Sequence, residues 1–255
     1  MMHKLVGDDI KKARHFFETY SYNQAVIFSV FENQYEGYIY LDNPNEPNWA
    51  VLQTSFLQHF IAGKPKSGCK KILEEILFSI ILNEQDEKEI VLLADDIEWN
   101  SILQGIYEER HGVSDFRKIY AFSLENYKSI NRHSTPSDIE IIINKSKPLP
   151  FSLKDTWSAK IKLDKKVISH CNALMVGKKM VEIDIGTEEN YRGKGYATIS
   201  ALALIDKLLE DDLTPTWSTW PFRLESQHIA EKLGFIKQPD AIAWIWMEGM
   251  NNKEI

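Results

Sequence analysis

Apolar and polar positions in the first half of the chain alternate between two periods. A period of two predicts strands, and a spacing of three to four residues predicts helices. The expected strands are 25–32, 37–42, 49–60, 89–95 and 117–124, and the expected helices are 8–20, 70–82 and 99–109. This order predicts strands and helices arranged around a sheet.

The second half continues this pattern. Its expected strands are 139–144, 166–176, 178–186, 214–220 and 241–247, and its expected helices are 196–209 and 226–233. Between the halves, residues 128–137 are polar, contain a proline and lack periodicity, as is typical of a linker. We therefore expect an N-terminal α/β domain over residues 1–127 and a second domain over residues 138–255.

The composition narrows the classes of protein that fit. Of 255 residues, 44% are apolar and 26% are charged, and the net charge is −7. Such an acidic chain lacks the basic surplus of general nucleic-acid binders, and its apolar runs are too short to span a bilayer. Cys69 and Cys171 match neither a zinc-binding spacing nor a disulfide framework. We expect a cytoplasmic protein that binds no metal, nucleic acid or membrane.

The stretch Arg192-Gly193-Lys194-Gly195 joins an expected strand to an expected helix. The first N–H groups of a helix lack intrahelical partners, and the helix dipole favours negative charge there. Glycines let a phosphate approach these donors closely, and the two cations add charge. Taken alone, the turn fits either a phosphate-binding site or an exposed turn without a ligand. It matches neither GxGxxG nor GxxxxGK[ST].

The flanks of this turn carry a family resemblance. Residues 192–197 fit the (Q/R)xxGx(G/A) motif of the GCN5-related N-acetyltransferases (GNAT family). The strand VEIDIGT (181–187) precedes the motif, the strand entry Pro215-Thr216-Trp217 follows it, and IAEKLGF (229–235) comes later. In this order, the features resemble the bacterial acetyltransferases of the zwittermicin A resistance type. The resemblance covers about residues 137–248.

The resemblance implies a fold and a co-substrate. The fold would be α/β of the α+β kind, with a mixed, mostly antiparallel central sheet flanked by helices. The co-substrate would be acetyl-CoA, with its pantetheine arm beside the end of the strand and its pyrophosphate in the turn. The residues implied beside pantetheine are Ile185, Gly186 and Thr187, and those implied at the phosphates are Arg192, Gly193, Lys194, Gly195, Tyr196 and Ala197, with Thr198 as a helper.

The resemblance also implies catalytic residues. Direct acetyl transfer to an amine needs a base that takes a proton from the ammonium. Glu182 matches the glutamate that serves as base in many relatives, and the alternative is a solvated polar residue on a half-buried strand. The tyrosine that often protonates the departing thiolate is replaced here by Ala230. Ser226 and His228 lie on the same expected helix and are the remaining catalytic candidates, although neither is at the matching position.

Two features remain outside this assignment. His170 and Cys171 are adjacent on an expected strand and therefore point to opposite sides, so they do not form a catalytic dyad. The element order of the first half parallels that of the second. The first domain is therefore either a degenerate GNAT-like copy or an unrelated α/β domain, which would close a wall of the acceptor site or mediate a homodimer.

The function implied is that of an acetyl-CoA-dependent N-acetyltransferase acting on a primary amine of a small molecule, such as a metabolite or an antibiotic. Two alternatives stay open. One is a module that binds acyl-CoA as a sensor without turnover. The other is an acyltransferase that acts on a protein or on an aminoacyl-tRNA. The acidic composition of the chain is unfavourable for binding tRNA.

Overall fold

The computed structural model describes residues 3–56, 58–84, 88–132 and 134–250. The chain forms two compact units. The first unit consists of Met1–Tyr22, Glu36–Arg117 and Ala241–Ile255, and the second unit consists of Asn23–Tyr35 and Lys118–Asp240. None of the helices within the described ranges has the length and apolar character that crossing a membrane requires.

The two units differ from the division expected from the sequence. Helix α2 (Gln24–Phe31) belongs to the second unit, although it lies early in the chain. Strand β6 (Val113–Phe122) is divided, since its residues up to Arg117 belong to the first unit and the rest to the second. The final strand β13 (Ala241–Met247) belongs to the first unit. The expected halves therefore exchange elements instead of meeting at one linker.

Part of the expected linker 128–137 is held against helix α7 (Tyr196–Glu210) within the second unit. The Arg132 guanidinium donates two hydrogen bonds to the Asp206 carboxylate, at 2.6 and 2.8 Å. The buried Tyr127 hydroxyl donates to the same carboxylate at 2.8 Å. Paired Arg–carboxylate hydrogen bonds fix geometry, so the segment at Arg132 is anchored. Residue 133 lies outside the described residues.

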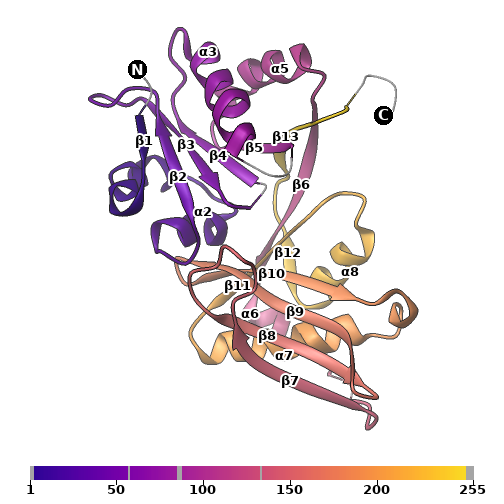
Figure 1. The fold of residues 1–255 in the computed structure, drawn as a ribbon. Helices are drawn as coiled ribbons and strands as arrows, with labels where there is room; N and C mark the ends of the chain where they lie inside the picture. Colours follow the sequence, from indigo (N-terminus) through magenta and orange to yellow (C-terminus); the bar gives the residue numbers. More distant parts are fainter. Residues whose placement is uncertain (1–2, 57, 85–87, 133, 251–255) are drawn as a thin grey trace. The chain divides into compact units, whose positions relative to one another are not determined.

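The first unit is a mixed sheet with helices on it. Its strand order is β1-β2-β3-β4-β5-β13-β6, in which β4 and β5 are parallel and the other neighbours are antiparallel. The strands besides β6 and β13 are β1 (His3–Leu5), β2 (Gly37–Leu41), β3 (Trp49–Thr54), β4 (Gln58–Gly63) and β5 (Glu89–Ala94). The helices are η1 (Gly7–Ala13), α1 (Arg14–Phe17), α3 (Cys69–Glu74), the π-helix η2 (Glu75–Ile81), α4 (Leu82–Glu84), η3 (Ile97–Trp99) and α5 (Asn100–Glu109). Helices α3 and α5 lie side by side (Figure 1).

The second unit is also a mixed sheet. Its strand order is β7-β8-β9-β10-β11-β6, with β12 paired to β6, and only β10 and β11 are parallel. The strands besides β6 are β7 (Ile139–Ser146), β8 (Thr156–Leu163), β9 (Lys166–Gly177), β10 (Met180–Thr187), β11 (Thr214–Thr219) and β12 (Phe235–Lys237). The helices besides α2 and α7 are α6 (Leu124–Lys128), η4 (Glu189–Tyr191) and α8 (Leu224–Lys232). The expected fold class, a mostly antiparallel mixed sheet flanked by helices, is confirmed.

Helices cover both faces of the second sheet. On one face lies α7 (Figure 1). It packs on a buried cluster that includes Val181, Ile183 and Trp217. On the other, α2 packs on β9 and β10. A Cβ at Gly177 would lie 2.4 Å from the backbone nitrogen of Ser29, so only glycine permits this close approach of α2.

The two units share one strand topology. In each unit, neighbours among the first four strands are antiparallel, the fifth strand is parallel to the fourth, and the sixth is antiparallel to the fifth. The orders are β1-β2-β3-β4-β5-β13 and β7-β8-β9-β10-β11-β6. In each, helices connect the two parallel strands, because a parallel connection needs a crossover. This shared order supports the expectation that the first unit is a degenerate copy, which remains a prediction.

Two of the predicted elements are wrong, and one long strand has no prediction. Residues 25–32 do not form a strand, because Gln24–Phe31 is the helix α2. Residues 25–31 are all buried, so no polar face marks the helical period. The single strand expected over 49–60 is the hairpin β3–β4. Strand β8 has no predicted counterpart, because its sequence TWSAKIKL mixes buried and half-buried positions.

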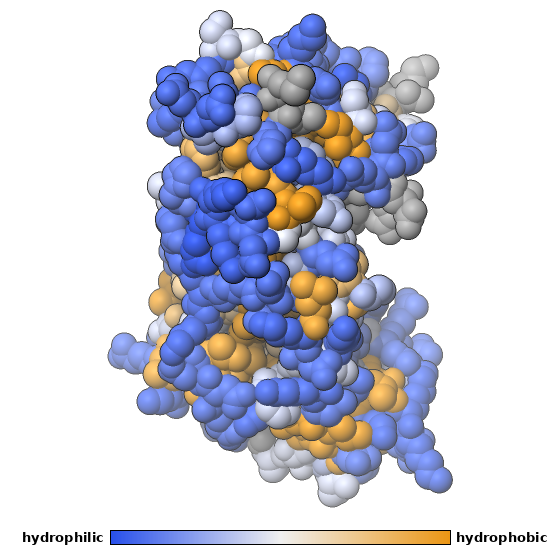
Figure 2. Space-filling view, turned by 60° about the vertical axis from the view of Figure 1, so that its left-hand side comes forward, coloured by the Kyte–Doolittle hydropathy of each residue, from blue (hydrophilic) through white to orange (hydrophobic). Residues whose placement is uncertain are grey.

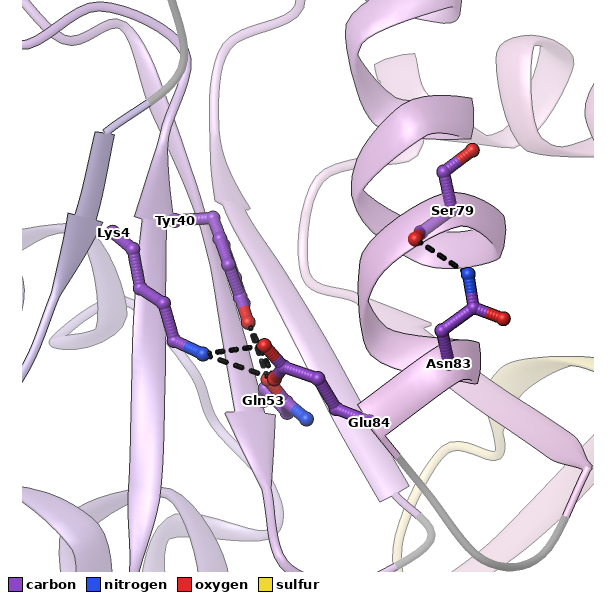
Figure 3. Close-up of polar contacts among 6 residues, drawn as sticks. All are labelled: Lys4, Tyr40, Gln53, Ser79, Asn83 and Glu84. Carbon is purple, nitrogen blue, oxygen red and sulfur yellow. Dashed lines mark hydrogen bonds and ion pairs between the residues drawn. The ribbon is translucent and has the colours of Figure 1, made fainter.

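The first unit contains a polar network around Glu84 (Figure 3). Lys4 Nζ donates to both Glu84 carboxylate oxygens at 2.9 Å. The Tyr40 hydroxyl lies 2.6 Å from Gln53 Oε1 and 3.2 Å from Glu84 Oε2. Burial and the charge of Glu84 raise the pKa of Tyr40, so its hydroxyl remains a donor.

The face of the molecule shown in Figure 2 is mainly hydrophilic, with apolar patches between the hydrophilic regions.

Candidate active site

The glycine turn between β10 and α7 has a left-handed backbone at both glycines. The φ angle is +75° at Gly193 and +85° at Gly195, a conformation that side chains disfavour. A Cβ at either position would meet no atom within 4 Å, so the space beside both glycines is open. Within the described part of the chain, the backbone N–H groups from Gly193 to Thr198 have no hydrogen-bond acceptor. The turn therefore presents donors to an open surface.

The two cations of the turn are exposed. Arg192 Nε donates to the carbonyl of Thr187 at 3.2 Å, and Lys194 Nζ donates to the carbonyl of Asn190 at 3.3 Å. An arginine has five N–H donors, and the bond to Thr187 uses only the one on Nε. The positive charge of both side chains therefore lies next to the backbone donors of the turn.

Three hydroxyls join the end of β10 to the start of α7. Ser169 Oγ donates to the carbonyl of Gly186 at 3.0 Å and lies 2.8 Å from Thr187 Oγ1. It also lies 3.4 Å from the Oγ of Ser200, which is fully buried. Ser169 and Ser200 are not among the site residues predicted from the sequence. The sequence feature that could have identified them is a serine on an otherwise apolar face of a strand or helix, because a buried hydroxyl needs hydrogen-bond partners.

Strands β10 and β11 form a fork. Their parallel pairing covers only Met180–Glu182 with Thr214–Thr216 and then stops. Beyond this point β10 continues to Thr187 paired with β9, and β11 continues to Thr219 paired with β6. The edge of β10 that faces the fork contains Ile185, Gly186 and Thr187. A strand edge without a neighbour offers backbone groups to an extended ligand.

Glu182 lies where the fork opens. Its side chain is 8% exposed, although the alternation of the sequence suggests a solvated face. The Thr216 hydroxyl donates to Oε2 at 2.7 Å, and the Ser218 hydroxyl donates to Oε1 at 2.6 Å. Both donors come from β11, so Glu182 is bonded across the fork. Buried carboxylates require such partners.

The candidates on α8 lie elsewhere. Trp217 Nε1 donates to Ser226 Oγ at 3.0 Å. Because Trp217 alternates with Thr216 and Ser218 on β11, it points to the face opposite Glu182. Ser226 is therefore not brought to the Glu182 carboxylate.

The other two positions on α8 also lack contact with Glu182. His228 is exposed. Ala230, at the position of the family tyrosine, is fully buried in the core under α7. The structure provides no room for a larger side chain to act as an acid from that position.

A second carboxylate lies two residues beyond Glu182. Asp184 Oδ2 lies 3.7 Å from His170 Nε2, and this polar contact with His170 holds the pKa of Asp184 below its ordinary value. A Cβ at Gly186 would lie 2.6 Å from the His170 ring, so glycine there leaves room for the ring. Cys171 is fully buried on the other side of β9, and burial raises its pKa. The expectation that His170 and Cys171 do not form a dyad is confirmed.

Comparisons with known proteins agree with this geometry. The family model described as GNAT acetyltransferase matches residues 154–240, which include the fork, the glycine turn and α8. The chain is 23% identical over 232 residues to the uncharacterised N-acetyltransferase YdfB of Bacillus subtilis, covering 84% of this chain and 87% of that protein.

Solved structures show the same fold. A GCN5-related N-acetyltransferase-like protein from Streptococcus suis superposes with a TM-score of 0.68 at 20% identity, over 94% of this chain and 100% of that one. A tandem GNAT protein from the clavulanic acid biosynthesis pathway superposes with a TM-score of 0.64 at 7% identity, over 99% of each chain. The fold is that of these GNAT structures, and the GNAT acetyltransferase family model matches a segment that lies within the second unit.

Proposed function

We propose that the second unit transfers an acetyl group from acetyl-CoA to a primary amine of a small molecule. The observation that carries this proposal is the fork between β10 and β11, with a buried carboxylate at its opening and the glycine turn directly after it. The family match over residues 154–240 supports the same assignment.

The residues of the turn fit the co-substrate. Left-handed Gly193 and Gly195 leave open space beside backbone N–H donors, which suits a pyrophosphate. Arg192 and Lys194 add positive charge, and the N–H groups from Tyr196 to Thr198 extend the set of donors. The free edge of β10 at Ile185–Thr187 suits the amide groups of pantetheine. When bound, acetyl-CoA supplies an acetyl group activated as a thioester.

Glu182 is the proposed base. An acceptor ammonium must lose a proton before its nitrogen can attack. The Ser218 hydroxyl offers a relay, since its oxygen can accept the ammonium proton while its own proton passes to Glu182 Oε1, 2.6 Å away. The carboxylate then becomes neutral and the amine becomes nucleophilic. The bond from Thr216 keeps Glu182 in place during this transfer.

Ser226 is assigned no step at the departing sulfur, because its oxygen accepts the Trp217 indole N–H on the face of β11 opposite Glu182. A thiol has an ordinary pKa of about 8.5, so its departure does not depend strongly on an acid. His228 is assigned no step, because its position on α8 is exposed.

The acceptor class rests on charge and resemblance. A net charge of −7 favours a cationic small molecule over an RNA acceptor. The likeness to the zwittermicin A resistance type suggests an amine-bearing metabolite or antibiotic. A homodimer in solution and a cytoplasmic location remain predictions of the sequence.

A thiol-release assay tests the proposal. Purified protein is mixed with acetyl-CoA and a panel of primary amines, and the free thiol is measured for wild type and Glu182→Gln. We expect amine-dependent release and a loss in kcat of about 10²–10⁴-fold in Glu182→Gln, with unchanged acetyl-CoA affinity. Binding without turnover on any amine would favour a sensor, and absence of binding would refute the assignment.

A further inference from the structure

The first unit contains a cavity at the carboxyl ends of its parallel strands. The cavity has a volume of about 510 Å³. Its walls come from α1 with the residues after it, from the loop after β4 and from the loop after β5. By strand order, β4 and β5 correspond to β10 and β11 of the second unit. Ligand sites commonly lie outside the carboxyl ends of parallel strands.

The strands beneath this cavity leave no fork. The parallel pairing of β4 with β5 covers residues 58–61 and 91–94, up to the last residue of β5. The buried Tyr20 hydroxyl lies 2.6 Å from the carbonyl of Ile61 and 3.0 Å from that of Leu93, so it bridges the two strands. A pantetheine arm therefore finds no open strand edge between β4 and β5.

The charges of the cavity favour a cation. Lys64 forms ion pairs with Asp96 and with Glu98, and their hydrogen bonds raise the pKa of Lys64 to about 12. With the charge of Lys64 matched by these partners, Asp95 adds a further negative charge to the cavity wall. Burial raises the pKa of Asp95, and the nearby Thr19 side chain opposes part of this shift. An ammonium group at this position would compensate the lost solvation of that carboxylate.

The remaining walls suit an apolar body attached to that ammonium. Phe16 lines the cavity beside His15, with ring centroids 4.2 Å apart. Ile97, also in the wall, is 81% exposed and adds an apolar side chain to the cavity. Aromatic faces also attract cations directly.

We propose that this cavity of the first unit binds a small primary ammonium compound with an apolar or aromatic body, with Asp95 as the ion-pairing residue. All wall residues of this cavity belong to the first unit, whereas the residues proposed for acetyl transfer belong to the second. It binds its ligand without coenzyme A.

Binding of 2-phenylethylamine to the full chain, measured by calorimetry, tests this proposal. The uncharged analogue 2-phenylethanol serves as the ligand control. We expect Asp95→Asn to weaken amine binding by about tenfold or more, because it removes a hydrogen bond between two charged groups. Asp212→Asn, an equal charge change at an exposed ion pair of the second unit, should leave binding unchanged.

Two further variants separate the outcomes. Ile97→Lys places a cation at an exposed wall position, so it should weaken amine binding without unfolding the unit. Glu182→Gln should leave this binding unchanged, which distinguishes the cavity from an acceptor site in the second unit. The proposal is overturned if 2-phenylethylamine fails to bind, if the alcohol binds equally well, or if both Asp95→Asn and Ile97→Lys bind it like wild type.

Discussion

The Ser218 hydroxyl donates a 2.6 Å hydrogen bond to Glu182 Oε1 from the opposite strand of the fork. A hydrogen bond to a charged group contributes about 1.5–3 kcal/mol, and here it also offers a proton path. We predict that Ser218→Ala lowers kcat about tenfold or more and leaves the acetyl-CoA affinity unchanged. Steady-state kinetics with saturating acetyl-CoA measure this.

Thr216→Val is the matched comparison for Ser218→Ala. It removes the other hydroxyl that bonds to Glu182 but no proton relay. We expect a smaller loss of kcat in Thr216→Val than in Ser218→Ala. Equal losses would mean that both hydroxyls only position the carboxylate, and a wild-type kcat in Ser218→Ala would exclude the relay.

Ala230→Tyr introduces the tyrosine that the family resemblance implies at this position, and we predict that this tyrosine does not act as an acid. Ala230 is fully buried beside Leu233 and Phe235, so a phenol there overpacks the core. The expected cost is about 1–3 kcal/mol in the free energy of unfolding, measured by urea denaturation. His228→Tyr on the exposed side of the same helix should be neutral. A stable and faster Ala230→Tyr enzyme would contradict this view of α8.

Tyr20→Phe tests how much the hydrogen bonds of the Tyr20 hydroxyl to β4 and β5 stabilise the first unit. The lost hydroxyl leaves the carbonyls of Ile61 and Leu93 without this buried donor. We expect a loss of about 1–3 kcal/mol in the free energy of unfolding. Tyr22→Phe removes one part-buried bond to Ala94 and should cost less. Denaturation of the three proteins side by side measures both values, and no loss in Tyr20→Phe would show that the bridge is dispensable.

Asp184 predicts a pH dependence of stability. The polar contact with His170 lowers the pKa of Asp184 in the folded state. Such a group stabilises the fold above the unfolded carboxyl pKa of about 4, and the stabilisation is lost as the pH falls through the folded pKa. Wild type should therefore exceed Asp184→Asn in unfolding free energy at about pH 6, with the difference shrinking towards about pH 3.

The exposed carboxylate Asp155 supplies the control for this pH series. Denaturant titrations of Asp155→Asn should show no comparable change with pH. A difference between wild type and Asp184→Asn that stays constant from about pH 6 to about pH 3 would mean that the His170 contact does not favour the charged form.

Much of the second unit was predictable from sequence. The alternation of apolar and polar residues in VEIDIGT and the helical spacing of apolar residues after Gly195 located β10, α7 and the turn between them. The burial of Glu182 was not predictable. It depends on hydroxyls of β11, which lie more than thirty residues further along the chain.

The exchange of elements between the units could not be predicted from local patterns. Helix α2 is apolar on all sides because it packs into the second unit, and this hid its helical period. The division of β6 depends on which strands pair with each half, namely β13 before Lys118 and β11 after it. Pairing partners at such sequence separations leave no periodic signal.

The binding of acetyl-CoA to two glycine variants tests the central claim most directly. Gly195 and Gly68 both have a left-handed backbone, at φ +85° and +80°, and both precede the first residue of a helix. A Cβ added at either glycine would meet no atom within 4 Å. Glutamate at either site therefore brings the same strain and the same charge. Only Gly195 belongs to the proposed phosphate cradle.

Calorimetry with acetyl-CoA should show a Kd weakened by about 100-fold or more in Gly195→Glu. Gly68→Glu should bind like wild type. Unchanged affinity in Gly195→Glu, or equal losses in both variants, would contradict the assignment of this turn to the coenzyme A pyrophosphate.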